Sequence, residues 1–545
     1  MNLRFVAFLL AGSAIAGPAS AAAPADGSDD RAADILVFGT PDNALTLPTT
    51  TGSRLGLTSL ETPASVTSLD GDEIRARGDL SIVDAVTRAP GITSSANPGN
   101  GGTALAARGF SGQGSVLQLV DGIRLFPVAG TITFPTDPWN VDRIEVLSGP
   151  ASVLYGQGAL GGAINVLTKQ PSDRTSLDAE ASYGSQDTRH IAADAGGPIG
   201  EMLSYRVDAS WRQSDGYVDR GRSKSIALAG ALHFAPTETF SLTVRDDYGN
   251  QRPMAYFGTP LIAGVLVNAN QRRNYNVADA SLHYRDNRAT LVANWSPSEA
   301  VVVSNAAYRL TSKRLFKDLE SYFYDAGTGM IDRADNLGIV HDQTQYGDQG
   351  TAKLSTPLGG TVHNDLVVGF DVNVIDLTYS NDFGSDSQED SVDPYRFDPG
   401  LFLDTQGIAP RFRTHTREYS LFAEDRLKLN EQISLVGGLR YESDRVRRSN
   451  IVYDINGTTS DAPVFSKQLN NTTWRVGAVY QPVRGVSIYA QYSTGVDPIG
   501  TLTTFSASQT QFKNTTGNQV EGGVKTSFLD GRGSVTLAAY RIVKK

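Results

Sequence analysis

The side chains that most often carry enzymatic or metal chemistry are few in this chain and lie far apart. Its 545 residues contain no cysteine and six histidines: His190, His233, His283, His341, His363 and His415. A zinc site needs cysteines, or histidines spaced so that they share one face of an element. No two of these histidines stand two or four positions apart, and no G-x-S-x-G nucleophile motif occurs. We therefore expect a protein that is not an enzyme and that holds neither a cofactor nor a metal site of its own.

Acidic residues set the charge of the chain. The formal net charge is −10, which would repel a nucleic-acid backbone and argues against such a partner. Seven carboxylates fall between positions 382 and 404: Asp382, Asp386, Glu389, Asp390, Asp393, Asp398 and Asp404. Oxygen-rich spacing of this kind could bind calcium, but the twelve-residue EF-hand pattern is missing. A solvated loop is the favoured interpretation.

The first 21 residues are typical of a secretory signal peptide. A charged start that includes Arg4 is followed by an apolar run from Phe5 to Leu10 and by an A-x-A site at Ala19 to Ala21. Gly12 and Pro18 interrupt the run well short of the ~20 apolar residues that a membrane-spanning helix needs. We expect export, and the absence of cysteine then requires a source of stability other than disulfides, such as a closed hydrogen-bonded barrel.

From position 175 to 545 the sequence alternates strictly between apolar and polar residues. Tyr205, Val207, Ala209 and Trp211 fall on one face of a predicted strand, with polar residues between them. Short turns alternate with long polar segments at 250–275, 315–338, 380–412, 446–468 and 494–515. Short turns on one side and long loops on the other are typical of a transmembrane β-barrel. About 15 strands can be counted, and we expect the barrel to be incomplete at the C-terminus of this chain.

Two further regions precede the predicted barrel. Residues 55–171 combine short helix signals, such as the Ser81 cap before Ile82–Val86, with apolar runs that fit buried strands, and they predict a mixed α/β domain. Residues 22–54 are rich in Ala, Asp, Thr and Pro and predict a flexible arm. One β-prone island interrupts the arm: Asp34, Ile35, Leu36, Val37 and Phe38.

Five sequence blocks occur in an order that resembles one family. They are TPASV at 62–66, RAPGI at 88–92, RGF at 108–110, DGIR at 121–124 and the glycine-rich run RIEVLSGPASVLYGQGALGGAINVLTK at 143–169. Together they resemble the plug domain of TonB-dependent outer-membrane receptors, and the chain looks closest to the ferric-siderophore branch, of the hydroxamate (ferrichrome and coprogen) type. The resemblance implies a 22-stranded barrel with the plug in its lumen, in the outer membrane of a Gram-negative bacterium.

The resemblance also implies partners and site residues. The island at 34–38 is similar to a TonB box, which pairs as an added strand with TonB; the alternative is an ordinary first strand of the plug. Arginines matching Arg108 and Arg143 pair with wall glutamates in the family, and alternation sends Glu521 to the lumen. Arg143 and Glu145 could instead be exposed strand charges. A monomer surrounded by lipid and lipopolysaccharide is expected.

Candidate ligand contacts come from the expected plug apex and from one barrel segment. They are Gln113, Gly114, Ser115, Phe126, Phe134, Trp139, Tyr256 and Phe257. Aromatic side chains suit a bulky, partly apolar ferric chelate, whose iron is already wrapped by the siderophore. Active import of a ferric siderophore is therefore the first functional hypothesis. Import of cobalamin, haem, another metallophore or a glycan, and a non-transporting adhesin or enzyme barrel, are the alternatives.

Overall fold

A computed structural model describes residues 45–97, 102–112, 114–126, 128, 134–382, 389–402, 407–498, 500–529 and 531–545. The predicted signal peptide, the island Asp34–Phe38 and the candidate contact Gln113 lie outside the described residues. Within the described ranges, no helix is long and apolar enough to cross a membrane.

The N-terminal domain is built on a five-stranded mixed sheet. Its strand order is β1 (Val66–Asp70), β7 (Val141–Ser148), β8 (Gly162–Thr168), β5 (Val116–Val120) and β6 (Ile123–Arg124). Only the β5–β8 pair within this sheet is parallel. A second sheet contains β2 (Ile92–Asn97), β3 (Gly102–Ala107) and β4 (Phe110–Ser111). The predicted mixed α/β plug is thus confirmed.

Short helices connect these strands, and their ends follow local sequence signals. They are α1 (Gly71–Arg77), α2 (Ile82–Val86), α3 (Ser152–Tyr155), η1 (Ser59–Glu61) and η2 (Pro138–Asn140). The Ser81 side chain accepts the Asp84 N–H at the start of α2, as the sequence predicts. Gly78 ends α1 at a φ of 75°, a left-handed conformation that glycine adopts without a Cβ penalty. Ile74, Ile144 and Ile164 are fully buried in the core beneath.

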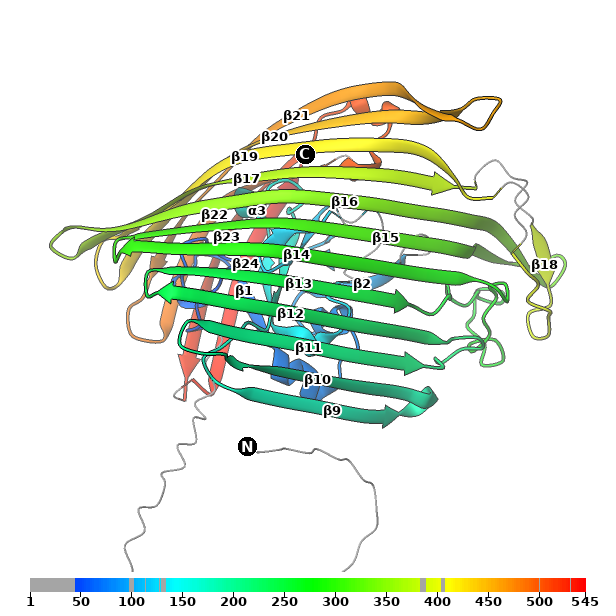
Figure 1. Ribbon diagram of the computed structural model, residues 1–545, viewed down its shortest axis with the longest axis horizontal. Helices are drawn as coiled ribbons and strands as arrows, with labels where there is room; N and C mark the ends of the chain where they lie inside the picture. Colours follow the sequence, from blue (N-terminus) through cyan, green and yellow to red (C-terminus); the bar gives the residue numbers. More distant parts are fainter. Residues whose placement is uncertain are drawn as a thin grey trace, which may run out of the picture.

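The second domain is one large antiparallel sheet. Its strands are β9 (Ser176–Gly184), β10 (Thr188–Pro198), β11 (Leu203–Ser214), β12 (Ser223–Thr237), β13 (Phe240–Arg252), β14 (Ser281–Ser298), β15 (Val301–Asp325), β16 (Met330–Gly359), β17 (Val362–Asn381), β18 (Asp390–Val392), β19 (Ala409–Lys428), β20 (Ile433–Tyr453), β21 (Thr459–Tyr480), β22 (Val486–Asp497), β23 (Thr515–Phe528) and β24 (Gly533–Lys544). The 3₁₀ turns η3 (Ser185–Asp187), η4 (Leu502–Thr504) and η5 (Ala507–Gln511) lie between strands. Each strand pairs with the next along the chain, except that β18 pairs only with β16. Figure 1 shows the sheet curving around the plug.

The outer face of this sheet is apolar and its inner face is polar. On β11, Val207 is 49% exposed while its neighbour Asp208 is 6% exposed. On β14, Leu291 is exposed while Arg288 is fully buried in the lumen. A lipid-facing exterior with a polar interior is the pattern of a transmembrane barrel, so the predicted alternation is confirmed.

Two of the five predicted long loops are wrong. Residues 315–338 and 446–468 are mostly strand, because the β15–β16 ladder continues to Asp325 opposite Met330 and the β20–β21 ladder continues to Tyr453 opposite Thr459. The residues of these segments are polar, but the backbone hydrogen bonds between the paired strands continue through them. The segments between β13 and β14, between β17 and β19, and between β22 and β23 are long connections as predicted.

Candidate functional site

The plug meets the barrel wall at an ion pair between Arg108 and Glu521. Arg108 lies in the turn between β3 and β4 at a φ of 51°, and its Nη1 lies 2.5 Å from Glu521 Oε2. Both side chains are buried, at 7% and 0% exposure. Alternation along β23 turns Val520 outward and Glu521 into the lumen. The structure therefore brings together two of the four residues expected to form plug–barrel ion pairs.

Glu521 also contacts the beginning of β1. Its Oε1 accepts hydrogen bonds from Ser65 N at 3.1 Å, from Ser65 Oγ at 2.7 Å and from Tyr489 Oη at 2.6 Å. A buried carboxylate needs such donors and a cationic partner to offset its lost hydration. One wall residue thus holds two plug segments that are distant in sequence.

Arg143 and Glu145 lie elsewhere, within the plug. Arg143 forms ion pairs with Glu145 at 3.0 Å and with Asp142 at 2.9 Å. Glu145 accepts hydrogen bonds from Thr50 N and from Thr51 N, at 3.0 and 2.9 Å. The expected pairing of Arg143 with the wall is therefore not what the structure shows. The reason is its strand: β7 lies between β1 and β8, so its neighbours are plug residues.

Residues 52–65, here called the strap, connect the arm to β1 and are held by the wall. Lys525 on β23 is fully buried, and its Nζ donates to Ser59 O at 2.5 Å, to Thr62 O at 2.8 Å and to Ala64 O at 2.7 Å. An ammonium has three N–H donors, and all three find carbonyl acceptors here. The ring of Tyr489 lies 4.7 Å from the same nitrogen.

Charged wall residues from three other strands contact the strap as well. Arg475 donates to Gly52 O at 3.0 Å, and Lys353 donates to Leu55 O at 2.7 Å. Glu424 accepts hydrogen bonds from Ser53 Oγ at 2.9 Å and from Arg54 N at 2.8 Å. Arg426 forms an ion pair with Glu61 at 2.8 Å. Most of these contacts are made to the main chain of the strap. They hold its conformation largely without regard to side-chain identity.

Tyr155 closes the plug side of this region. Its hydroxyl donates to Thr50 O at 2.9 Å, and the Arg54 guanidinium lies 4.9 Å from its ring centroid. Burial raises the pKa of Tyr155 to about 12. The hydroxyl therefore remains a protonated donor throughout the physiological range.

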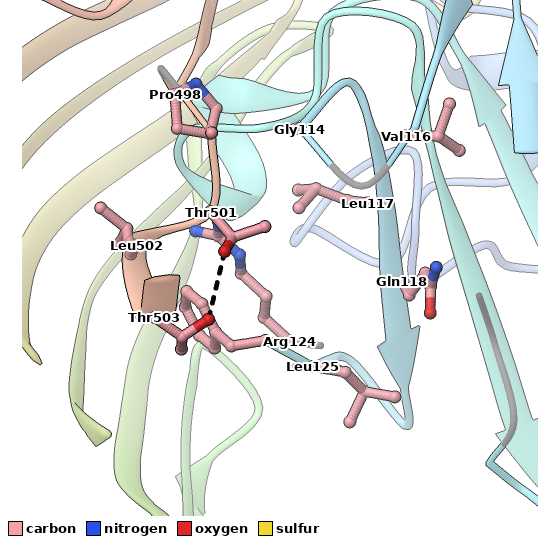
Figure 2. A pocket seen from close by; sticks show the side chains of 12 residues that line it. Gly114, Val116, Leu117, Gln118, Arg124, Leu125, Pro498, Thr501, Leu502 and Thr503 are labelled. Atoms are coloured by element: carbon pink, nitrogen blue, oxygen red, sulfur yellow. Dashed lines mark hydrogen bonds between the residues drawn. The ribbon is translucent and has the colours of Figure 1, made fainter. Parts of the chain in front are cut away.

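A first cavity lies between the β5–β6 hairpin of the plug and the segment that follows β22. It is partly open to solvent, and the space inside it, open solvent included, is about 440 Å³. Gly114, Arg124 and Phe126 line it from the plug, and Pro498, Thr501 and Thr503 from the barrel segment. Figure 2 shows Arg124 among the lining residues, together with Thr501 and Thr503, which are joined by a hydrogen bond of 3.3 Å.

A second cavity, of about 470 Å³, shares Gln118, Leu125 and Phe126 with the first. Phe134 lines it from the plug, and Asp286, Arg314, His341 and Gln343 line it from the wall. Among the residues that the structure describes, the wall of this cavity includes buried polar atoms without a hydrogen-bond partner, namely Asp286 Oδ2, His341 Nδ1 and Gln343 Oε1. A polar guest would find acceptors and one imidazole nitrogen there.

Four other expected ligand contacts lie outside these two cavities. Ser115 donates to Asp497 at 2.5 Å and is buried. Trp139 is buried beneath Lys169, whose Nζ lies 4.7 Å from the ring. Phe257 packs on the wall near Phe316, and Tyr256 bonds Thr259 at 2.6 Å. Of the eight expected contacts, the cavities contain Gly114, Phe126 and Phe134.

A row of aromatic rings on the wall was not foreseen. Tyr284, Phe316, His341, Tyr379 and Phe412 come one from each of five neighbouring strands, with centroids 4.7 to 5.5 Å apart. Each lies on a different strand and far from the others in sequence, so only the register of the sheet places them together. His341 is the member that also borders the second cavity.

Comparison with known proteins agrees with this architecture. Residues 210–545 match the family described as TonB dependent receptor-like, beta-barrel, and residues 58–163 match the TonB-dependent Receptor Plug Domain. The chain belongs to the TonB-dependent receptor family. It is therefore an outer-membrane β-barrel receptor with an N-terminal plug.

Several curated receptors are similar to this TonB-dependent receptor. The probable siderophore receptor PiuA of Acinetobacter baumannii is 23% identical, over 93% of this chain and 72% of PiuA. The metal-pseudopaline receptor CntO of Pseudomonas aeruginosa is 26% identical, over 75% of this chain and 57% of CntO. The ferrioxamine B receptor of Salmonella typhimurium is 25% identical, over 91% of this chain and 70% of that receptor. The chain thus spans between 57% and 72% of the length of these relatives.

Solved structures show the same fold. The crystal structure of PiuA from Acinetobacter baumannii superposes with a TM-score of 0.81 at 20% identity, over 92% of this chain and 75% of that one. The closed form of the ferric-catecholate import receptor Fiu from E. coli superposes with a TM-score of 0.78 at 19% identity, over 92% of this chain and 76% of the Fiu chain. At these identities the likeness concerns the fold of the receptor, not its cargo.

Proposed function

We propose that this TonB-dependent receptor imports a ferric siderophore across the outer membrane. The observation that carries the proposal is the pair of adjoining cavities between the plug and the wall, lined by the aromatic rings of Phe126 and Phe134 and by polar side chains, some of them charged. Such a lining suits a bulky chelate whose iron is already coordinated, because the protein then supplies contact area and orientation rather than metal ligands. The relatives named for ferrioxamine B and for siderophores support the same class.

The finer proposal is a hydroxamate-type cargo. The charges that border the second cavity are one cation and one anion, Arg314 and Asp286, whose closest atoms lie 3.5 Å apart. A strongly anionic chelate would gain little from such a balanced pair. The acceptor atoms Asp286 Oδ2 and Gln343 Oε1 suit a neutral cargo that carries amide or hydroxyl donors.

Coupling to TonB is proposed through Asp34–Phe38. An extended, β-prone segment needs only its backbone to add a strand to a partner sheet. A pull on the arm would first reach the plug contacts of Thr50 and Thr51 with Glu145 and then the strap that follows them. A monomer in contact with lipid and lipopolysaccharide completes the proposal.

A growth and binding experiment tests the cargo. The full-length gene is expressed in an iron-starved, receptor-null strain, which is fed purified ferric hydroxamates, ferric catecholates, haem or cobalamin. We expect growth on at least one ferric hydroxamate. Growth only on a catecholate would contradict the finer proposal, and a response only to haem or cobalamin would contradict the siderophore proposal itself.

A cavity-filling variant connects the cargo to the site. A Cβ added at Gly114 meets nothing closer than 3.8 Å, so Gly114→Phe can project into the first cavity without displacing the plug backbone. We expect cargo affinity to fall at least tenfold. Gly200→Phe, in the turn between β10 and β11 where the added Cβ has no neighbour within 4 Å, is the matched control.

A further inference from the structure

Three carboxylates of the wall converge beside the plug. Glu418 lies on β19, and Glu442 and Asp444 lie on β20. Glu418 stands directly opposite Asp444 in the register of β19 and β20. Glu442 is two residues before Asp444 on β20 and lies on the same face of the strand. Like charges placed opposite each other destabilise a sheet unless something neutralises them. All three are buried, with exposures of 1%, 1% and 0%.

The arginines within ion-pair distance of these carboxylates do not balance their charge. Arg440 makes its short contact to a fourth carboxylate, Asp371, at 2.6 Å, and lies 3.4 Å from Glu442 and 3.9 Å from Glu418. Arg124 of the plug lies 3.4 Å from Glu418. Four carboxylates and the two guanidinium groups that contact them leave two negative charges. That surplus equals the charge of one divalent cation.

Asp444 is the least compensated member. Within the described part of the chain it forms no ion pair; its Oδ2 accepts a hydrogen bond from Gln157 Nε2 at 2.7 Å, and its Oδ1 has no partner. A buried carboxylate in that state carries a large desolvation cost. A second observation concerns Thr416, which is two residues before Glu418 on β19 and therefore on the same face of the strand. Its fully buried hydroxyl also has no hydrogen-bond partner among the described residues. Thr416 is diagonal to Asp444 in the register and lies on the same face of the sheet as Glu418.

The spacing of these oxygens fits a hard cation. One carboxylate oxygen from each of Glu418, Glu442 and Asp444 lies within 4.8 Å of the other two. Calcium binds oxygen ligands at about 2.3–2.6 Å, so two ligands on opposite sides of one ion stand about 4.6–5.2 Å apart. Magnesium, at about 2.0–2.1 Å, requires a tighter and more regular cage. The all-oxygen donor set excludes the softer metals as preferred guests.

The plug closes over this cluster. Gln157 N donates to Glu442 Oε1 at 3.1 Å, and a Cβ added at Gly156 would meet Glu442 Oε2 at 1.9 Å. The turn at 156–157 therefore lies directly on the carboxylates. An ion held there would be shielded from bulk water by the plug on one side and by the wall on the other.

We propose that Glu418, Glu442 and Asp444 bind one calcium ion, which neutralises the wall carboxylates and fastens the Gly156–Gln157 turn of the plug to the barrel. The ion would be resident in the receptor and separate from the imported cargo. The proposal does not depend on the identity of that cargo.

Calcium binding to purified, chelator-treated full-length receptor tests the proposal. We expect one saturable site in a calorimetric Ca²⁺ titration, with Mg²⁺ at least tenfold weaker. Asp444→Asn and Glu442→Gln should each weaken Ca²⁺ binding at least tenfold. Asp393→Asn, in the acidic segment after β18, controls for surface binding and should leave the site unchanged.

Hydrogen exchange supplies a measurement that needs no variant. Calcium should slow amide exchange of residues 152–160 in the native receptor and leave the strap unaffected. Absence of saturable binding by the native receptor would overturn the proposal and would indicate that protons neutralise the cluster. Binding that survives both Asp444→Asn and Glu442→Gln would overturn it as well, by placing the calcium elsewhere.

Discussion

The Lys525 ammonium on the barrel wall lies 2.5 Å from the carbonyl oxygen of Ser59 in the plug. The same nitrogen reaches two further strap carbonyls, so a fully buried cation is coordinated by main-chain oxygens rather than by a carboxylate. The carbonyls belong to the turn that precedes β1. A single side chain of the barrel thus makes three of the contacts that hold this turn against the wall.

Replacing that side chain should loosen the strap. Hydrogen bonds to a charged donor contribute about 1.5–3 kcal/mol each when buried, so Lys525→Met should raise amide exchange in residues 58–66 at least tenfold. The barrel ladders should keep their protection. Lys353→Met removes one contact, to Leu55 O, and serves as the matched control with a smaller effect. Equal exchange in the native and Lys525→Met receptors would show that the carbonyl contacts hold nothing in place.

The Arg108–Glu521 ion pair should behave as one interaction. Removing either partner leaves the other buried and uncompensated, so Arg108→Ala and Glu521→Ala should each accelerate exchange in the plug, and the double variant should be little worse than either. A double-mutant cycle compares the free energies of plug opening, obtained from hydrogen exchange, in the native, single-variant and double-variant receptors. We expect it to give a coupling energy of about 1–3 kcal/mol. Arg143→Ala should add fully to Glu521→Ala, because Arg143 pairs within the plug. Additivity of Arg108→Ala with Glu521→Ala would contradict the pairing.

Acid should weaken the strap through Glu61. Burial opposes ionisation of this carboxyl, but the Arg426 guanidinium and hydrogen bonds from Thr58 outweigh burial and lower the pKa of Glu61 from its ordinary 4.5. Because the pKa of Glu61 is lower in the folded state than in the unfolded state, its ionised carboxylate stabilises the fold at pH values above the unfolded-state pKa. This stabilisation is lost as the pH falls through the folded-state pKa. The Glu61 side chain is 28% exposed, so the effect should stay near or below about 1 kcal/mol.

Protection factors of the strap at several pH values measure this effect. Those of the native receptor should fall as the pH drops below 4.5, the ordinary pKa of this glutamate. Glu61→Gln should flatten that part of the profile and leave the remainder unchanged. A profile that is the same with and without the carboxyl would assign the acid sensitivity to another group.

The sequence anticipated contacts made by side chains better than contacts made to the main chain. Alternation from Val520 to Val524 was enough to place Glu521 in the lumen. The same period places Lys525 there, yet nothing in the sequence identifies its partners, because every residue carries a carbonyl. The expected pairing of Arg143 with the wall rests on the family resemblance, in which the arginine of the matching motif pairs with a wall glutamate, and only the sheet order shows that β7 is internal.

The cavities illustrate a second limit. Phe126 and Phe134 were found because they lie in the predicted apical loops of the plug. Arg314 and His341 were missed because each is one polar residue in an alternating strand, with no local signal that distinguishes it from other lumen residues. Their meeting depends on the register of β15 against β16, in which they stand directly opposite each other. Register over such distances is set by the whole sheet.

Coupling to TonB should depend on the backbone of the island at 34–38. Leu36→Pro and Val37→Pro each remove an N–H donor and fix φ, which prevents strand addition at that position. We expect ferric-siderophore uptake to fall to background while binding of the same chelate to whole cells is unchanged, since the cavities lie in the plug and barrel. Asp26→Pro, in the same arm but outside the island, should leave both measurements at the native level. Loss of binding together with uptake would place the island in the folded plug instead.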